Sequence, residues 1–182
     1  MESIKYLALL RGINVGGNNI IRMADLKSGF EDMGFSDVKT YIQSGNVIFK
    51  SDEKDKSVMI HKIETELSQR FSYKSKIVVI SHEHLETVVS NAPEGYGTQP
   101  EEFKYDVLFM KEPLTADEAF QSIKVREGVD FVSAGKDVLY FSRLISKAGQ
   151  SYLNQVISLP IYKQMTIRNW NTTSKLLNLM NF

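Results

Sequence analysis

The order of strand-like and helix-like segments along this chain restricts its fold more than any other feature. Short apolar runs of strand length alternate with segments in which apolar residues recur every three or four positions, the spacing of one helical face. The expected segments of the first part are, in chain order, a strand at 4–10, a helix at 23–33, strands at 38–43 and 47–49, a helix at 60–71 and a strand at 77–80. Gly34 and a turn at 44–46 supply the breaks that a helix end and a hairpin require. This part therefore follows the order βαββαβ.

The same order begins again after a helix at 82–91 and a loop that contains Gly and Pro. Thr115 and Glu118 form a capping box, which predicts the start of the next long helix. The other expected segments are strands at 105–110, 129–132 and 138–141, a turn at 134–136, a helix at 152–157, a strand at 165–168 and a final helix that begins near Trp170. We therefore predict an α+β protein of two tandem ferredoxin-like (βαββαβ) plaits with antiparallel sheets, plus a C-terminal helix. The expected boundaries are 1–81 for the first plait, 82–103 for a connecting helix and loop, and 104–182 for the second plait with its helix.

Composition restricts the class of protein. The chain has 182 residues, long enough for one large domain or two small ones, and its 42% hydrophobic content can fill a core. It contains no cysteine, so disulfides, thiolate metal ligands and cysteine nucleophiles are excluded. The apolar run at the amino terminus is too short for a signal peptide or a bilayer span, and Arg11 follows it directly. We expect a soluble, cytoplasmic protein with no membrane partner.

Charge is balanced over the whole chain but not along it. The 22 basic and 22 acidic residues cancel, which argues against a nucleic-acid partner because phosphate binding needs a basic surface. All the acids lie at or before Asp137, so the segment from Val138 onward carries only basic residues. This positive segment is either a solvated surface balanced by acids elsewhere, which is the commoner case, or part of a site for an anion.

Three segments combine glycine, short amides, hydroxyls or an arginine at the ends of predicted strands, where loops often carry function. They are Arg11–Asn19, Tyr41–Val47 and Thr166–Thr172. The candidate ligand-binding residues within them are Arg11, Gly12, Asn14, Gly16, Gly17, Asn19, Tyr41, Gln43, Ser44, Asn46, Arg168 and Asn169. None of the segments contains a recognisable catalytic set, so the sequence identifies no catalytic residue.

The first segment matches part of a phosphate-binding loop. Gly12–Gly17 fits the opening G-x-x-x-x-G between a strand and a helix, but Asn18 and Asn19 stand where that motif needs a Lys and a hydroxyl. We therefore reject a nucleotide-hydrolysing loop. Two interpretations remain. Either the glycines direct backbone N–H groups at an anion, with further donors from Arg11 or Asn14, or the segment is a tight strand-to-helix connection whose Asn side chains bond their own backbone.

The second segment divides into turn residues and strand residues. A hairpin turn by itself accounts for Gly45, and also for Ser44 and Asn46. Tyr41 and Gln43 alternate along the expected strand and should share one face of the sheet. They would contact either a ligand or a polar partner there.

The third segment begins a helix. Trp170 is the only tryptophan and is expected to be buried, while Asn169 is a suitable helix cap. Arg168 lies just before this helix, where the helix dipole and a guanidinium would both favour an anion. The alternative for Arg168 is a structural ion pair with an acid of the first plait.

Together, the three segments resemble the signature blocks of a bacterial family of proteins of unknown function, DUF1697. The resemblance rests on Leu10–Gly17 with Asn19, Ile21 and Met23, on Thr40–Val47, and on Arg168–Thr172, and it spans essentially the whole chain. It implies two ferredoxin-like plaits and no established reaction. Family members often have a Lys where this chain has Ile20, so one cation of the anion-binding interpretation is absent here.

Three function classes follow. The first is binding of a small anionic or phosphate-containing ligand through the Gly/Asn-rich turns and the arginines. The second is an enzyme whose residues converge only in three dimensions. The third is an RNA-binding module, which ranks last because Asn46–Lys50 lacks the basic-Gly-aromatic pattern of RNA-binding sheets. No metal site is expected, since His82 and His84 are spaced too closely to share a helical face. The sequence identifies no cofactor and no oligomeric state.

Overall fold

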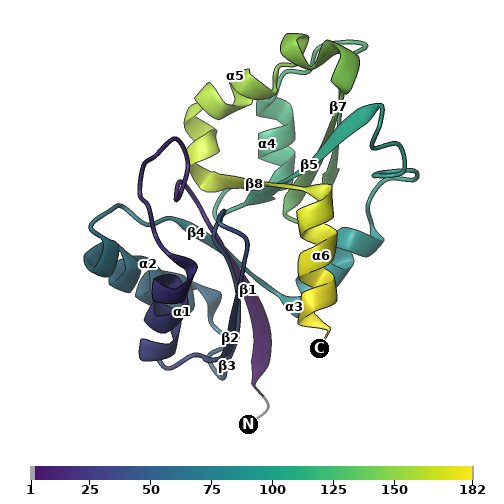
Figure 1. The fold of residues 1–182 in the computed structure, drawn as a ribbon. Helices are drawn as coiled ribbons and strands as arrows, with labels where there is room; N and C mark the ends of the chain where they lie inside the picture. Colours follow the sequence, from purple (N-terminus) through teal and green to yellow (C-terminus); the bar gives the residue numbers. More distant parts are fainter. Residues whose placement is uncertain (1–2, 182) are drawn as a thin grey trace. The chain divides into compact units, whose positions relative to one another are not determined.

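The computed structural model describes residues 3–181, which form two compact units (Figure 1). The first unit ends at Leu85, and the second extends from Glu86 to Asn181. Each unit contains one four-stranded antiparallel sheet, with strand orders β2-β3-β1-β4 and β6-β7-β5-β8. These are the strand orders of a ferredoxin-like plait, so the prediction of two tandem plaits with a C-terminal helix is confirmed.

The first unit follows the predicted order. Its elements are β1 (Ile4–Leu10), α1 (Met23–Asp32), β2 (Ser36–Tyr41), β3 (Asn46–Ser51), α2 (Lys56–Phe71) and β4 (Ile77–Ser81). Asp55 caps α2 by accepting hydrogen bonds from the backbone N–H groups of Ser57 and Val58. The continuous apolar run of β1 is explained by its central place in the sheet, because it pairs with β3 on one side and β4 on the other.

The helix α3 (His82–Ser90) leads from the first unit into the second. The elements that follow are β5 (Phe103–Met110), α4 (Ala116–Ser122), β6 (Asp130–Gly135), β7 (Val138–Leu144), a 3₁₀ helix η1 (Ile145–Gln150), α5 (Leu153–Ser158), a second 3₁₀ helix η2 (Pro160–Gln164), β8 (Met165–Asn169) and α6 (Trp170–Met180). The capping box of Thr115 and Glu118 is present at the start of α4, as predicted.

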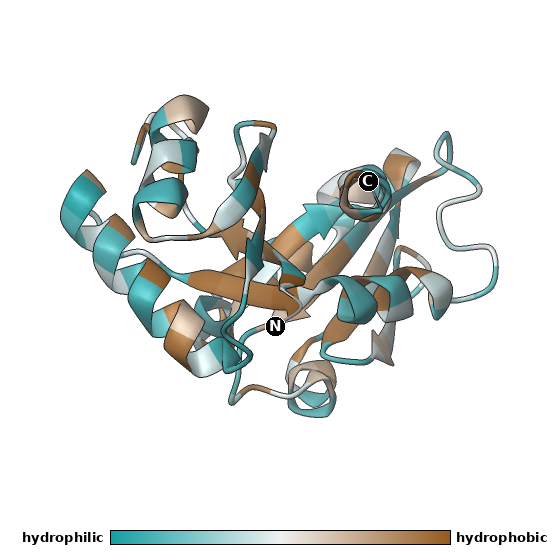
Figure 2. Cartoon of the chain, turned by 90° about the horizontal axis from the view of Figure 1, so that it is seen from below, coloured by the Kyte–Doolittle hydropathy of each residue, from teal (hydrophilic) through white to brown (hydrophobic). Residues whose placement is uncertain are grey.

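Each unit has its own hydrophobic core on one face of its sheet. In the first unit, Phe30, Phe35 and Phe49 form a cluster with ring centroids 4.6 to 5.8 Å apart. In the second, Leu139 and Phe141 are fully buried among residues of α4, α5 and the sheet. Figure 2 shows hydrophobic residues concentrated on the strands, whereas the helices alternate between hydrophobic and hydrophilic residues. No helix within residues 3–181 is long and apolar enough to span a membrane.

Both hairpin turns differ from the predicted ones. β2 ends at Tyr41, and Ile42 adopts a left-handed backbone conformation with φ of 49°. The turn therefore occupies 42–45, Asn46 is the first residue of β3, and Tyr41 and Gln43 do not alternate along one strand. In the second hairpin, β6 continues through Gly135 and the turn contains only Lys136 and Asp137. The prediction that the strand continues through residue 42 is wrong, because the positive φ of Ile42 ends the strand. A β-branched residue rarely has positive φ, so its identity gave no sign of this turn.

Candidate functional site

The loop Arg11–Arg22 and the turn 42–45 meet at one end of the first sheet, and together we call them the loop–hairpin face. The N–H of Leu10 donates to the carbonyl of Gly45 at 2.8 Å, and the N–H of Arg11 donates to the carbonyl of Lys76 at 3.0 Å. A Cβ on Gly45 would lie 2.6 Å from Cδ1 of Ile13 and 2.8 Å from Cβ of Leu10. Glycine is therefore required at position 45 by this close approach as well as by its φ of 80°.

The side chain of Asn14 ties the loop to the hairpin. Its Nδ2 donates to the carbonyls of Ile21, at 3.0 Å, and Gln43, at 2.9 Å, while its Oδ1 accepts from the N–H of Ile21 at 2.8 Å. Within the loop, Nδ2 of Asn19 donates to the carbonyl of Gly12 at 2.8 Å. Both amides thus bond backbone groups, as in the tight-connection interpretation.

Gly16 and Gly17 form the tip of this loop. The N–H of Asn18 donates to the carbonyl of Val15 at 3.0 Å, and the two glycines between them have φ values of 59° and 76°. Positive φ at both central residues is the pattern of a type I′ turn, which glycine adopts without steric cost. Turn geometry therefore accounts for both glycines.

The hairpin turn is held together by Asn46. This residue is fully buried, and its Nδ2 donates to the carbonyl of Tyr41 at 2.9 Å and to Oγ of Ser44 at 3.0 Å. Ile42, the first residue of the turn, is apolar but exposed, and it has positive φ. Asn46 and Ser44 thus stabilise the turn from within, and Ile42 is held in a conformation that β-branched residues disfavour.

Three further donor groups lie on the loop–hairpin face beside the hydrogen bonds of Asn14, Asn19 and Asn46. Arg11 is half-buried at the end of β1, and the amide side chain of Gln43 is exposed. Among residues 3–181, the backbone N–H of Gly12 has no protein acceptor. This face of the first unit therefore offers one cation, Arg11, and two neutral donors, the N–H of Gly12 and the amide of Gln43.

Arg168 and Asn169 belong to the second unit. Oδ1 of Asn169 accepts from the N–H of Thr172 at 2.8 Å, so Asn169 caps α6, as predicted. Arg168 is buried and donates from Nη1 to the carbonyl of Ile167 at 2.9 Å. Burial lowers the pKa of Arg168 to about 10, and the guanidinium still remains charged at neutral pH. Trp170 is half-buried and packs edge-on against Tyr96, with ring centroids 5.1 Å apart.

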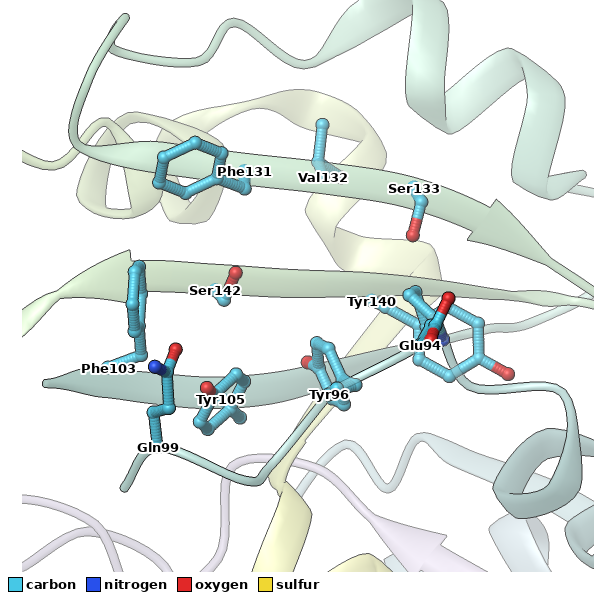
Figure 3. A pocket seen from close by; sticks show the side chains of 12 residues that line it. Glu94, Tyr96, Gln99, Phe103, Tyr105, Phe131, Val132, Ser133, Tyr140 and Ser142 are labelled. Atoms are coloured by element: carbon cyan, nitrogen blue, oxygen red, sulfur yellow. The ribbon is translucent and has the colours of Figure 1, made fainter. Parts of the chain in front are cut away.

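The second sheet carries a hollow of about 290 Å³ that sequence reasoning missed (Figure 3). Its lining residues come from the loop before β5 and from β5, β6 and β7: Pro93, Glu94, Gly95, Tyr96, Gln99, Phe103, Tyr105, Phe131, Val132, Ser133, Tyr140 and Ser142. We call the five aromatic residues among them, Tyr96, Phe103, Tyr105, Phe131 and Tyr140, the aromatic box. The floor includes Ser142, which lies on β7 opposite Tyr105 on β5 and Phe131 on β6.

A local signal for this hollow does exist in the sequence. Phe103 and Tyr105 alternate along one strand, as do Tyr140 and Ser142 along another, so each pair lies on one face of the sheet. Such alternation is also found in ordinary core strands, and only the pairing of the strands places the aromatic residues around a serine. The loop residue Tyr96 carries no such signal, because its place depends on the tertiary fold.

Comparison with known proteins gives a family but no activity. The sequence model of the family described as "Protein of unknown function (DUF1697)" matches residues 4–140, a range that includes the first two signature segments and ends before the third. No curated protein matches the chain. Among solved structures, the chain is similar to the conserved bacterial protein SP0830 from Streptococcus pneumoniae, with 26% sequence identity and a TM-score of 0.86. That similarity covers 98% of this chain and 99% of the other.

Proposed function

This chain belongs to the DUF1697 family of unknown function, and within it we propose that the protein binds a small ligand with an anionic group, such as a phosphate, at the loop–hairpin face. The proposal is one of binding and includes no chemical step. The observation that carries it is the brace made by Asn14, which joins two irregular segments 29 residues apart in sequence. A binding site gains from such a support because less freedom is lost when the ligand arrives.

The Gly/Asn-rich turns form the frame of this proposed site. Asn14, Asn19 and Asn46 hold the backbone in place through the hydrogen bonds already described. The left-handed Ile42 supports a functional role for the turn, because strained residues persist where the surrounding structure holds them and they are common at binding sites.

The proposed ligand contacts come from half-buried Arg11, the N–H of Gly12 and the exposed amide of Gln43. Arg11 provides the positive charge and a planar set of donors suited to two oxygens of a phosphate or carboxylate. The N–H of Gly12 and the amide of Gln43 provide neutral donors beside it. In the second unit, we assign Asn169 to helix capping and Arg168 to the interior, so this proposal does not use them.

A thermal-shift titration tests the proposal with inorganic phosphate, sulfate and a nucleoside monophosphate. A ligand at 100 times its dissociation constant stabilises the folded state by about 2.7 kcal/mol, which produces a clear rise in melting temperature. Arg11→Ala should abolish that rise. Its melting temperature without ligand, measured alongside, reports the contacts that half-buried Arg11 makes within the protein. The matched control is Arg22→Ala, because Arg22 belongs to the same loop but is exposed and pairs with Asp25 at 2.7 Å.

Two outcomes would overturn the proposal. One is a wild-type protein whose melting temperature responds to none of the three anions at millimolar concentration. The other is an equal loss of response in Arg11→Ala and Arg22→Ala, which would show only a general effect of charge. Consumption of the nucleotide during the titration would assign the protein to the enzyme class instead.

A further inference from the structure

From the aromatic box on the second sheet we infer a separate binding site for a small alkylated ammonium cation, such as a free trimethylammonium compound. The site lies entirely within the second unit and shares no residue with the loop–hairpin face. The inference is therefore independent of the proposed anion site.

The spacing of the strands creates room for one ligand group. Phe131, Ser142 and Tyr105 lie side by side on β6, β7 and β5, so two rings stand on either side of a small residue. Neighbouring strands are about 4.8 Å apart, which places the backbones of the outer two roughly 10 Å apart. Carbon atoms in contact need about 3.5–4 Å on each side. The ring of Phe103 lies 5.9 Å from that of Phe131 and 6.0 Å from that of Tyr105, so it closes one end of this gap. A compact group above Ser142 would therefore contact three rings.

Three ring pairs of the box meet at steep angles, whereas Phe103 and Tyr105 are inclined by only 36°. Tyr96 lies at 66° to Tyr105 and at 71° to Tyr140, with centroids 4.8 and 5.4 Å away. Phe103 lies at 70° to Phe131, at 5.9 Å. A nucleobase would stack best on a flat, open ring, whereas a rounded cation is attracted to several ring faces around it. This arrangement favours the cation.

The walls are fixed before any ligand arrives. The hydroxyl of Tyr96 donates to the carbonyls of Asp106, at 2.7 Å, and Phe141, at 3.1 Å, and the hydroxyl of Tyr140 donates to the carbonyl of Val88 at 2.6 Å. Burial raises the pKa of Tyr140 to about 12 and that of Tyr96 further, so both phenols keep the protons that these bonds need.

The charge around the hollow has the sign that a cation requires. Glu94 is the only charged side chain in its lining, and no Lys or Arg is present there. Among the described residues, the hydroxyls of Ser133 and Ser142 make no hydrogen bond to protein, so they can accept a polar part of the ligand. Ring faces and a carboxylate attract a quaternary ammonium and repel an anion. The volume of about 290 Å³ is at the lower end of the range for ligand sites, which indicates a small compound.

The test is a fluorescence titration of the whole protein with choline chloride at constant ionic strength. Trp170 is the only tryptophan and contacts Tyr96, so its emission reports on the box. We expect saturable binding of choline, and binding of its neutral carbon isostere that is weaker by roughly twofold to thirtyfold, the range for loss of a cation–π contact. Equal binding of the charged and neutral compounds would overturn the inference, and so would a response only to adenosine or to inorganic phosphate.

Three variants locate the site. Phe131→Ala removes one wall and should weaken choline binding by roughly twofold to thirtyfold; the side chain is 49% exposed, so the fold should persist. Phe120→Ala is the matched control, because Phe120 is 41% exposed on α4 of the same unit and does not line the hollow. Glu94→Gln should weaken choline binding by about twofold to fivefold, as for an exposed ion pair, and leave binding of the neutral isostere unchanged. Unchanged choline affinity in both Phe131→Ala and Glu94→Gln would refute the site.

Discussion

The two sheets share one backbone plan but carry different side chains, and one row of residues shows the difference clearly. In the first sheet the N–H of Leu10 binds the carbonyl of Gly45, and in the second the N–H of Met110 binds the carbonyl of Asp137, which aligns the two sheets residue by residue. At the level where the second sheet has Tyr105 opposite Ser142, the first has Lys5 opposite Lys50.

The row of the first sheet that contains Lys5 and Lys50 includes an ion pair with a neighbouring acid. Nζ of Lys50 lies 2.6 Å from a carboxylate oxygen of Asp37, in the bulge of β2. The same plait therefore forms with an exposed ion pair at this level, and the fold alone does not require rings there. The aromatic box therefore distinguishes the second unit from the first, and ligand binding is our proposed reason for it.

On the faces covered by helices, the two sheets are alike. Phe49 of β3 and Phe141 of β7 occupy corresponding positions on the helix-covered faces, and both are fully buried. Both plaits thus have a packed aromatic residue on the covered face of the third strand.

The largest expected effect concerns this shared feature. Phe49→Ala and Phe141→Ala should each lower the free energy of unfolding of their own unit by about 3–5 kcal/mol, because each removes a fully buried ring and leaves a cavity. Native-state hydrogen exchange of amides in β1 and β5 would measure the two units separately. Costs that differ between the units by more than about 2 kcal/mol would break the equivalence of the two cores.

A smaller effect separates the two hairpins. Gly45→Ala should destabilise the first unit by about 1–3 kcal/mol through overpacking against Ile13 and Leu10, with roughly 1–2 kcal/mol more from positive φ. Asp137 occupies the corresponding backbone position with φ of 57° and already carries a Cβ, so Asp137→Ala introduces no overpacking there. Chemical denaturation of both variants measures the difference. Equal costs would show that φ alone, and not the contact with the loop, requires glycine at position 45.

The fold was predictable because its signals are local. The apolar run of β1, the stripe of α2 and the capping box at Thr115 each lie within one segment, and the order of such segments leaves few topologies. The hairpin at 42–45 could not be placed correctly, since nothing local indicates that Ile42 takes positive φ. In the structure, Asn14 and Asn46 bond the carbonyls of Gln43 and Tyr41, the residues on either side of Ile42.

The candidate sites were predictable in part. The first two signature segments lie together at one end of the first sheet, but the sequence did not show that Asn14, Asn19 and Asn46 are bonded to backbone groups. An Asn amide can bond a turn of its own backbone or a ligand equally well. The residue type therefore does not show which of the two partners it has, and only the hydrogen bonds of the structure do. The aromatic box was missed because its residues come from four segments that only the pairing of strands and the loop at Tyr96 bring together.

The smallest expected effect concerns the charged row, and it distinguishes the two sheets by pH and salt. The hydrogen bond and the charge of Lys50 lower the pKa of Asp37 below its usual value. A carboxyl whose pKa is depressed by folding stabilises the protein above its unfolded pKa, and this contribution disappears as the pH falls through the folded pKa. Asp37→Asn keeps a residue that tolerates the φ of 50° at this position, so the variant removes the charge with little change in backbone strain.

Asp37→Asn should therefore melt slightly below the wild type at pH 7, and the difference should vanish in acid and in concentrated salt, because an exposed pair is screened. Ser142→Ala, at the corresponding level of the second sheet, changes no charge, and its effect on the melting temperature should be the same at every pH and salt concentration. Thermal melts of both variants at pH 7 and pH 2, with and without molar salt, make the comparison. Two results would contradict this comparison of the sheets. One is a change in melting temperature for Ser142→Ala that depends on pH, and the other is a change for Asp37→Asn that does not depend on salt.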